Sequence, residues 1–275
     1  MVVSDGPARW HARPMAWDSA YFGTPMVKLE TASWDDDVRQ PVEALAASAG
    51  RLARELATDG RYYLWAELPA EDHVPVQALG LSGFRLVETR LTYFHPEPAD
   101  VLWPERYPVR VAGPKDVPHL REIAAAARNP YDRYHVDGFF GAEVADRYLA
   151  TYLEASVAGL ADFVVVPDPG DGAPAGGFFT STLSTPPSCP VGGDPSCGLE
   201  LGVGRVPLVA VGPGRAGWHL RLLVETTRFL ADRGADVVCM TTQATNGAVR
   251  RNCEKVGYRL GRVTHVLARS NGRAR

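Results

Sequence analysis

One four-residue pattern occurs twice in this chain of 275 residues, and the two copies lie 174 positions apart. Gly83-Phe84-Arg85-Leu86 matches Gly257-Tyr258-Arg259-Leu260 near the C-terminus. At the same offset three further pairs correspond: Tyr62–Leu68 with Asp236–Thr242, Asp72 with Asn246, and Val87–Phe94 with Gly261–Ala268. Each copy therefore predicts a strand, a short helix, a Gly-aromatic corner and a second strand. Convergence of two unrelated corners is the alternative, but the unbroken offset favours a truncated N-terminal copy of the C-terminal half.

Composition and charge exclude several classes of protein. Hydrophobic residues make up 45% and charged residues 22%, as in ordinary globular proteins. The formal net charge of −3 gives no basic footprint for nucleic acid. The opening MVVSDGPARW lacks the features of a signal peptide, and no apolar run approaches the roughly 18 residues of a membrane helix. We therefore expect a cytoplasmic protein that binds neither nucleic acid nor membrane.

Four cysteines are too few and too scattered for a disulfide scaffold. We expect reduced thiols, and Cys239, in an apolar run, is most simply a buried small hydrophobe. Cys189 and Cys197 bracket a Gly/Pro loop, and whether they pair on oxidation stays open.

Pro/Gly-rich stretches suggest the domain organisation. They fall at 96–108, 167–175 and 185–198, and the first is the most linker-like. We predict an N-terminal half-domain over residues 1–98, a linker over 99–108 and a main domain over 109–275. Periodicity from residue 109 onward predicts the order β-α-α-β-β-β-α-β-α-β, a mixed α/β layer with one sheet. Its elements are strands at Val109–Ala112, Phe163–Val166, Gly176–Leu183, Gly198–Val211, Asp236–Thr241 and Leu260–Ala268, with helices after Asp116 and at Ala142–Val157, Trp218–Ala231 and Ala248–Val256.

The most informative segment is Leu208–Leu223, LVAVGPGRAGWHLRLL. An apolar strand runs into a small-residue loop that opens a helix, and Arg215 adds a positive charge to that loop. Such a loop lets backbone amides approach an anion. The segment is neither a P-loop nor a Rossmann turn, because the Lys-Ser/Thr ending and the downstream ribose acid are missing. An ordinary glycine-rich turn is the alternative.

This segment, the order of elements and the Asn246…Gly257-Tyr258 stretch resemble the GNAT acyltransferase family. The resemblance implies a GNAT fold, with a mostly antiparallel sheet, and acetyl-CoA as co-substrate, its pyrophosphate held by the loop amides. The glycine of the family motif falls on Gly217. The first and last motif positions fall on Gly214 and His219, which depart from the family pattern, and the loop is about two residues shorter than usual. The residues implied to bind the coenzyme are Val209, Val211, Gly214, Arg215, Ala216, Gly217, Trp218, His219 and Asn246.

A closer resemblance starts at Trp17-Asp18-Ser19-Ala20-Tyr21-Phe22-Gly23, which is similar to the opening of TDP-fucosamine N-acetyltransferases. These enzymes carry a truncated half-domain before the GNAT domain and acetylate an amino sugar linked to a nucleotide. Met240–Asn246 is similar to their strand and helix start. In these enzymes a tyrosine seven residues after the asparagine acts as general acid toward the leaving CoA thiolate. This chain has Cys253 at that position.

Three groups are therefore candidates for the proton chemistry. Cys253 is the candidate acid toward the CoA thiolate; inert packing of Cys253, a role for Tyr258, and no dedicated acid are the alternatives. Glu67 and Glu200 are the candidate bases for the acceptor amine, and Glu67 ranks slightly ahead because a carboxylate in an apolar strand is costly without a task or partner.

Aromatic and basic residues alternate in Arg128–Phe140, RNPYDRYHVDGFF. Such a segment suits a base, a sugar or a diphosphate, and a surface loop with aromatic anchors is the alternative. We predict that Phe22, Arg133, Tyr134 and His135 bind the acceptor, and we expect no metal, because the histidines lack ligand spacing.

The sequence thus predicts an N-acetyltransferase that moves an acetyl group from acetyl-CoA to a small amine by direct attack. The resemblance implies a TDP-amino sugar as acceptor. A different small amine or antibiotic and a catalytically inactive GNAT-fold binding module are the alternatives. The acyl chain length, the acceptor and the oligomeric state stay open, a homodimer being one alternative.

Overall fold

The structure is a computed structural model that describes residues 1–4, 6–170, 172–184, 201–215 and 217–272. The chain forms two compact units. Unit 1 consists of Met1–Arg90, Pro130–Gly141 and Val263–Arg275, and unit 2 of Leu91–Asn129 and Ala142–Arg262. These units differ from the predicted division at residues 99–108. Strands β5 (Arg85–His95) and β12 (Arg259–Ser270) each contribute residues to both units, which a division in chain order does not anticipate.

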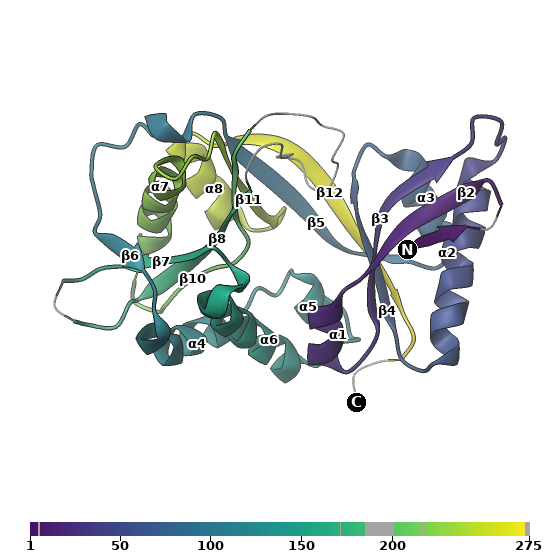
Figure 1. Ribbon diagram of the computed structural model, residues 1–275, viewed down its shortest axis with the longest axis horizontal. Helices are drawn as coiled ribbons and strands as arrows, with labels where there is room; N and C mark the ends of the chain where they lie inside the picture. Colours follow the sequence, from purple (N-terminus) through teal and green to yellow (C-terminus); the bar gives the residue numbers. More distant parts are fainter. Residues whose placement is uncertain (5, 171, 185–200, 216, 273–275) are drawn as a thin grey trace. The chain divides into compact units, whose positions relative to one another are not determined.

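Helices and strands alternate through most of the chain (Figure 1). The other strands are β1 Val2–Ser4, β2 Ala8–Pro14, β3 Met26–Trp34, β4 Tyr63–Pro69, β6 Val109–Val111, β7 Phe163–Pro167, β8 Gly177–Ser184, β9 Val203–Val206, β10 Val209–Val211 and β11 Val237–Gln243. The helices are α1 Ala16–Phe22, α2 Pro41–Thr58, α3 His73–Leu81, α4 Val117–Ala126, α5 Arg133–Val136, α6 Ala142–Ala155, α7 Trp218–Ala231 and α8 Gly247–Val256. Short helical turns lie at Pro98–Asp100, Pro114–Asp116 and Ser156–Leu160.

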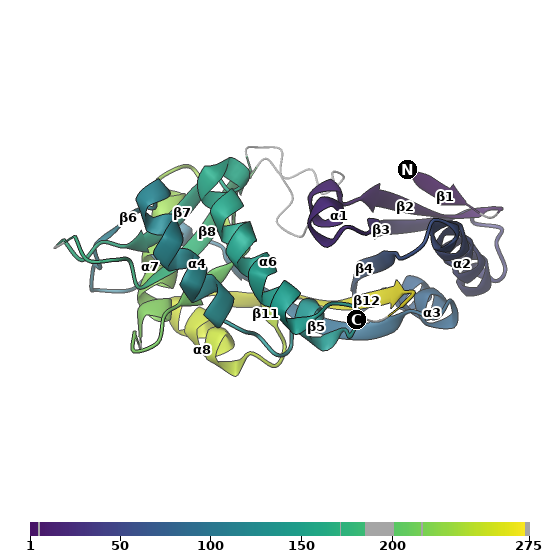
Figure 2. The same ribbon diagram turned by 90° about the horizontal axis from the view of Figure 1, so that it is seen from below.

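Unit 1 is built on strands in the order β1-β2-β3-β4-β12-β5. The β1–β2, β2–β3 and β4–β12 pairs are antiparallel, and β3 runs parallel to β4. Successive residues of β4 point to opposite faces of the sheet. Leu64 and Ala66 join the core under α2, where Trp10 Nε1 donates to the Leu45 carbonyl at 3.0 Å. Figure 2 shows α2 beside β2 and β3.

The opposite face of β4 carries an aromatic cluster. Tyr63 and Trp65 pack there with Phe139 and Phe140, and the cluster is bordered by Phe22 at the end of α1. The segment 130–141 therefore belongs to unit 1, although the helices on either side of it in sequence belong to unit 2.

Unit 2 has the strand order β5-β11-β9-β8-β7-β6, and β10 pairs with β8 outside this path. The β6–β7, β7–β8, β8–β9 and β8–β10 pairs are antiparallel, and β11 runs parallel to β9. Val164 faces the core shared with Leu120 of α4 and Leu153 of α6, whereas its neighbour Phe163 contacts Phe229 of α7. Alternation along β7 thus places α4 and α6 on one face and α7 on the other (Figure 1).

The repeated corner is confirmed. At the offset of 174 residues, β4 coincides with β11 residue for residue, and the N-caps Asp72 and Asn246 of α3 and α8 also coincide. Each corner glycine has a positive φ, +83° at Gly83 and +99° at Gly257, which favours glycine. The Phe84 N–H donates to the Leu79 carbonyl at 3.0 Å, and the Tyr258 N–H donates to the Cys253 carbonyl at 3.0 Å. The chain therefore contains two β-α-β corners of the same construction.

The segment predicted as a linker is attached to α7 within unit 2. Arg228 donates through Nη1 to the Glu105 carbonyl at 3.0 Å and through Nη2 to the carbonyls of Val101 and Trp103. The Tyr107 N–H donates to Glu225 at 3.1 Å, and Glu225 in turn pairs with Arg228 at 2.9 Å. Buried polar side chains on α7 therefore fix a segment that composition alone marks as a free connection.

None of the helices in the described ranges combines the length and the apolar character needed to cross a membrane.

Candidate coenzyme site and acceptor cluster

A bulge divides the strand predicted over Gly198–Val211 into two. Arg205 of β9 pairs with Thr182, but Val209 of β10 pairs with Phe179, so the register shifts by one residue across Pro207–Leu208. Thr180 holds the bulge: its N–H donates to the Leu208 carbonyl at 2.9 Å, and its Oγ1 accepts from the Leu208 N–H at 2.9 Å. Proline lacks a donor, so it is tolerated where a ladder is interrupted.

The bulge separates β10 from β11. The parallel ladder between β11 and β9 ends at Met240 and Val206, and the described residues form no ladder between Thr241–Gln243 and Val209–Val211. On either side of β10, the Leu208 carbonyl accepts from the Thr180 N–H and the Gly212 N–H donates to the Gly176 carbonyl, and between them Ala210 pairs with Phe178 of β8. Because neighbouring residues of a strand point their N–H and C=O groups to opposite sides, those of Val209 and Val211 point away from β8. An extended ligand with amide groups can pair with this open edge.

The loop after β10 has the backbone expected of an anion-binding turn. Gly214 and Gly217 have positive φ angles of +75° and +85°, and Gly217 is the N-cap of α7. No heavy atom of the described structure lies within 4 Å of a Cβ built on either glycine. The Arg215 side chain lies against Gly176, so close that a Cβ there would meet its Nε at 2.8 Å. The first turn of α7 therefore opens at a glycine with unobstructed space, and a basic residue precedes it in the loop.

His219 follows in the first turn of α7, directly after Trp218. The Asn252 amide donates to its Nδ1 at 3.0 Å, and Phe179 contacts the ring edge to face at 5.2 Å. Burial lowers the pKa of His219 to about 4, so the ring is neutral at pH 7 and carries its proton on Nε2. In the described residues Nε2 is a buried donor with no acceptor.

Asn246 is the N-cap of α8. Its side chain accepts the Val249 N–H at 3.3 Å and so caps α8.

Cys253 lies in the interior of unit 2, fully buried, with its Sγ 3.8 Å from the Met240 sulfur. Burial raises the pKa of Cys253 to about 12, with Glu254 adding to the effect. A thiol with that pKa is a weaker acid than the roughly 8.5 of an ordinary thiol, so protonating a CoA thiolate from it is unfavourable. Tyr258 is also buried: burial raises its pKa, and its hydroxyl is bonded to Thr227 at 2.6 Å.

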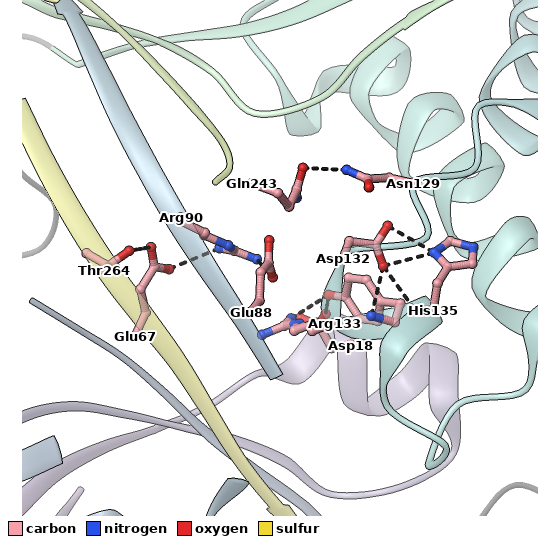
Figure 3. A network of polar contacts seen from close by, with 11 residues as sticks. Asp18, Glu67, Glu88, Arg90, Asn129, Asp132, Arg133, His135, Gln243 and Thr264 are labelled. Carbon is pink, nitrogen blue, oxygen red and sulfur yellow. Dashed lines mark hydrogen bonds and ion pairs between the residues drawn. The ribbon is translucent and has the colours of Figure 1, made fainter. Parts of the chain in front are cut away.

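Glu67 belongs to a network of charged side chains in unit 1 (Figure 3). Arg90 Nη1 donates to its Oε2 at 3.0 Å, and Thr264 Oγ1 donates to its Oε1 at 3.0 Å. Arg90 also pairs at 2.9 Å with Glu88, whose side chain is fully buried. Burial alone would raise the pKa of Glu67, but Arg90 and Lys28 outweigh it and hold that pKa below its ordinary value. The carboxylate is thus half-buried with partners and is a weaker base than an ordinary glutamate.

The four residues predicted to bind the acceptor come together in unit 1. Phe22 stacks on Tyr134 with ring centroids 5.9 Å apart, and the Arg133 guanidinium lies 4.6 Å from the Tyr134 ring. Asp132 caps α5 by accepting the Tyr134 and His135 N–H groups at 2.9 and 3.0 Å, and it pairs with His135 Nδ1 at 2.9 Å. The tight cap explains why this short helix forms.

The sequence reasoning missed Lys28, Glu88, Arg90 and Thr264. The signal for two of them was available: Glu88 and Arg90 are two positions apart on one strand and so share a face. Lys28 and Thr264 reach Glu67 through strand pairing distant in sequence.

Glu200, Ala216, Cys189 and Cys197 lie outside the described residues. Within the described part of the chain no three His, Cys, Asp or Glu side chains are grouped to hold a metal ion.

Several solved structures resemble this chain. A GCN5-related N-acetyltransferase from Sphaerobacter thermophilus aligns with a TM-score of 0.60 and 16% identity over 96% of this chain and 76% of its own. A GCN5-related N-acetyltransferase from Kribbella flavida aligns with a TM-score of 0.59 and 17% identity, over 99% of this chain and 90% of its own. A tandem GNAT protein from the clavulanic acid biosynthesis pathway aligns with a TM-score of 0.55 and 12% identity, over 92% of this chain and 77% of its own.

The chain has the GNAT fold. The predicted fold class is thereby confirmed. No family model matches the sequence, and no curated protein matches it either. At these identities the likeness establishes the fold alone.

Proposed function

We propose that the protein is an acetyl-CoA-dependent N-acetyltransferase that acts on a small-molecule amine. The observation that carries the proposal is the open edge of β10, which continues into the glycine loop and the first turn of α7. Residues with separate roles in binding an acyl-CoA follow one another over eleven positions, Val209–His219.

Each part of this segment suits one part of acetyl-CoA. Val209 and Val211 offer backbone groups to the amides of the pantetheine arm. Gly214, Gly217 and Arg215 suit the pyrophosphate, because a helix N-terminus and a guanidinium both favour phosphate oxygens. The Nε2–H of His219 adds a donor in the first turn of α7, at a position that departs from the family pattern.

Direct attack of the neutral amine on the thioester forms the amide N–C bond and breaks the C–S bond; CoA leaves as a thiolate and takes up the proton that the amine nitrogen loses. We propose that no dedicated protein acid serves this step, since Cys253 and Tyr258 are both buried groups of raised pKa. We assign Glu67 a positioning role on Arg90, because its lowered pKa makes it a poor acceptor for the ammonium proton. Glu200 stays the second predicted base.

The acceptor we propose is an amine on a sugar or similar small molecule, and a TDP-linked amino sugar is the finer form of this proposal. Its support is the resemblance of the Trp17–Gly23 segment and the aromatic cluster of unit 1. A fungal structural neighbour is described as a glucosamine N-acetyltransferase region, and this chain covers 31% of that chain.

The test is an assay for released CoA with acetyl-CoA and a panel of amines: TDP-amino sugars, free amino sugars, amino acids and aminoglycosides. We expect acetyl-CoA binding, and turnover with at least one sugar amine. Binding without turnover on any class would favour an inactive GNAT-fold binding module. Absence of acetyl-CoA binding would contradict the proposal.

A further inference from the structure

Arg133 is a buried guanidinium that the described chain leaves mostly without acceptors. Its residue is 4% exposed, and among the described residues its Nε and Nη1 have no hydrogen-bond partner. Only Nη2 donates, to the hydroxyl of Tyr134. A buried charged donor without an acceptor is strongly unfavourable, so it calls for a partner that is not among these residues.

No carboxylate in the described part of the chain forms an ion pair with Arg133. The nearest connection runs through Tyr134, whose hydroxyl donates to Asp18 Oδ1 at 3.4 Å. The two carboxylates nearest along β4 and β5, Glu67 and Glu88, both pair with Arg90. These two carboxylates are therefore engaged by Arg90.

The surroundings of Arg133 hold it in place without neutralising it. Its Cζ lies 3.8 Å from the centroid of the Trp65 ring, and Lys28 lies over the same ring at 4.9 Å. Lys28 adds positive charge to the cluster, and the Trp65 Nε1–H is a further buried donor without an acceptor in the described residues. Stacking on aromatic rings orients a guanidinium while leaving its edges available to oxygen acceptors.

We propose that Arg133 binds an anionic oxygen group, a carboxylate or a phosphate, carried by the acceptor amine. That the ligand is the acceptor rests on the proposed function; the anion site itself does not. A neutral amine would leave the guanidinium unpaired, so the site would discriminate strongly in favour of anionic acceptors.

The first test uses inorganic phosphate and acetate as separate probes on the full chain saturated with acetyl-CoA, so that the glycine loop is already occupied. The readout is the Nε–Hε NMR signal of Arg133, assigned by its loss in Arg133→Met. We expect a saturable shift with at least one anion. A shift with phosphate alone supports a phosphorylated acceptor, and a shift with acetate supports a carboxylate. No saturable shift with either anion overturns the proposal.

Two variants keep the test interpretable. Arg54→Met, at an exposed position of α2, is the matched control and should leave the Arg133 signal and its response unchanged. If Arg133→Met fails to fold, Arg133→Lys keeps the charge but loses the planar fork, and weaker anion binding with an unchanged circular dichroism spectrum supports the proposal. Anion binding of wild-type strength in Arg133→Lys overturns it.

The second test compares acceptor pairs that differ only in the anion, such as an amino sugar and its phosphate, or an amino acid and its amide. In Arg133→Met we expect kcat/KM for the anionic member to fall about 30- to 1000-fold, mainly through KM, with little change for the neutral member. Equal losses for both members overturn the assignment. Acetyl-CoA binding is measured on the same samples, so its absence in the wild type would refute the proposed function separately.

Discussion

The Asn252 amide donates to Nδ1 of His219 at 3.0 Å and thereby fixes the proton of this buried imidazole on Nε2. Asn252 lies on α8 and His219 in the first turn of α7, so two helices of unit 2 together orient one donor. This bond makes the protonation state of His219 a measurable property of the proposed coenzyme site.

Protonation of His219 predicts a pH-dependent loss of stability. Burial lowers the folded-state pKa to about 4, whereas an unfolded histidine titrates near 6.5. Between these values the unfolded chain binds a proton that the folded chain does not, so the free energy of unfolding falls as pH falls from about 6.5 to about 4. The expected contribution is up to about 3 kcal/mol. Urea unfolding of the wild type and His219→Gln over this range should show a shallower slope for the variant; equal slopes would count against this assignment.

The open edge of β10 predicts a backbone effect on coenzyme affinity. Val211→Pro removes one N–H that points away from β8, and proline is tolerated where no ladder bond is lost. We expect the Kd for acetyl-CoA to rise about tenfold with little change in Tm. Val211→Ala keeps the N–H and is the control, with a Kd close to that of the wild type. Equal Kd values for Val211→Pro and the wild type would refute pairing at this edge.

The attachment of residues 101–107 to α7 predicts a large stability effect far from any ligand. Arg228→Ala removes donors to three carbonyls and takes from the buried Glu225 its closest charged partner, leaving it the Tyr107 N–H and the exposed Arg106. We expect the free energy of unfolding to fall by about 3–5 kcal/mol in urea titrations. Arg250→Ala, at an exposed position of α8, should change it by less than about 0.5 kcal/mol. Similar losses in both variants would mean that the segment is not held by Arg228.

The ion pairs of Glu67 predict that part of the free energy of unfolding depends on the ionisation of this carboxylate. The pKa of Glu67 is lowered in the folded state, so its contribution is present above the ordinary glutamate pKa and is lost as pH falls through the folded pKa. Glu67→Gln should cost about 2–4 kcal/mol at pH 7 and less below pH 4. Glu30→Gln, which breaks the exposed pair with Arg13, should cost under about 1 kcal/mol. A cost for Glu67→Gln that does not depend on pH would contradict the pairing.

Sequence periodicity predicted the local elements well and the connections poorly. The bounds of α7 at Trp218–Ala231 were predicted correctly, because an amphipathic helix carries its own pattern. The repeat located both corners, since each depends on a glycine with positive φ. The break at Pro207–Leu208 was missed because an apolar run looks the same with and without a bulge.

The part of the candidate site that lies in one continuous segment of the chain could be predicted from the sequence. The loop from Gly214 to His219 is readable from residue types alone. The partners of Glu67 and Arg133 were not predictable, because Arg90 and Thr264 reach Glu67 from strands distant in sequence, and Trp65 of β4 contacts Arg133 of the helix α5. The shortage of acceptors for Arg133 within the described residues becomes visible only once Glu67 and Glu88 are seen to pair with Arg90.

Binding of acetyl-CoA to the β10 edge and the α7 loop is the central claim, and a titration followed by backbone amide NMR tests it most directly. We predict saturable shifts of the Val209, Val211, Gly214 and Gly217 amides and of the His219 ring. Absence of saturation, or shifts that leave residues 209–219 unaffected, would contradict the account.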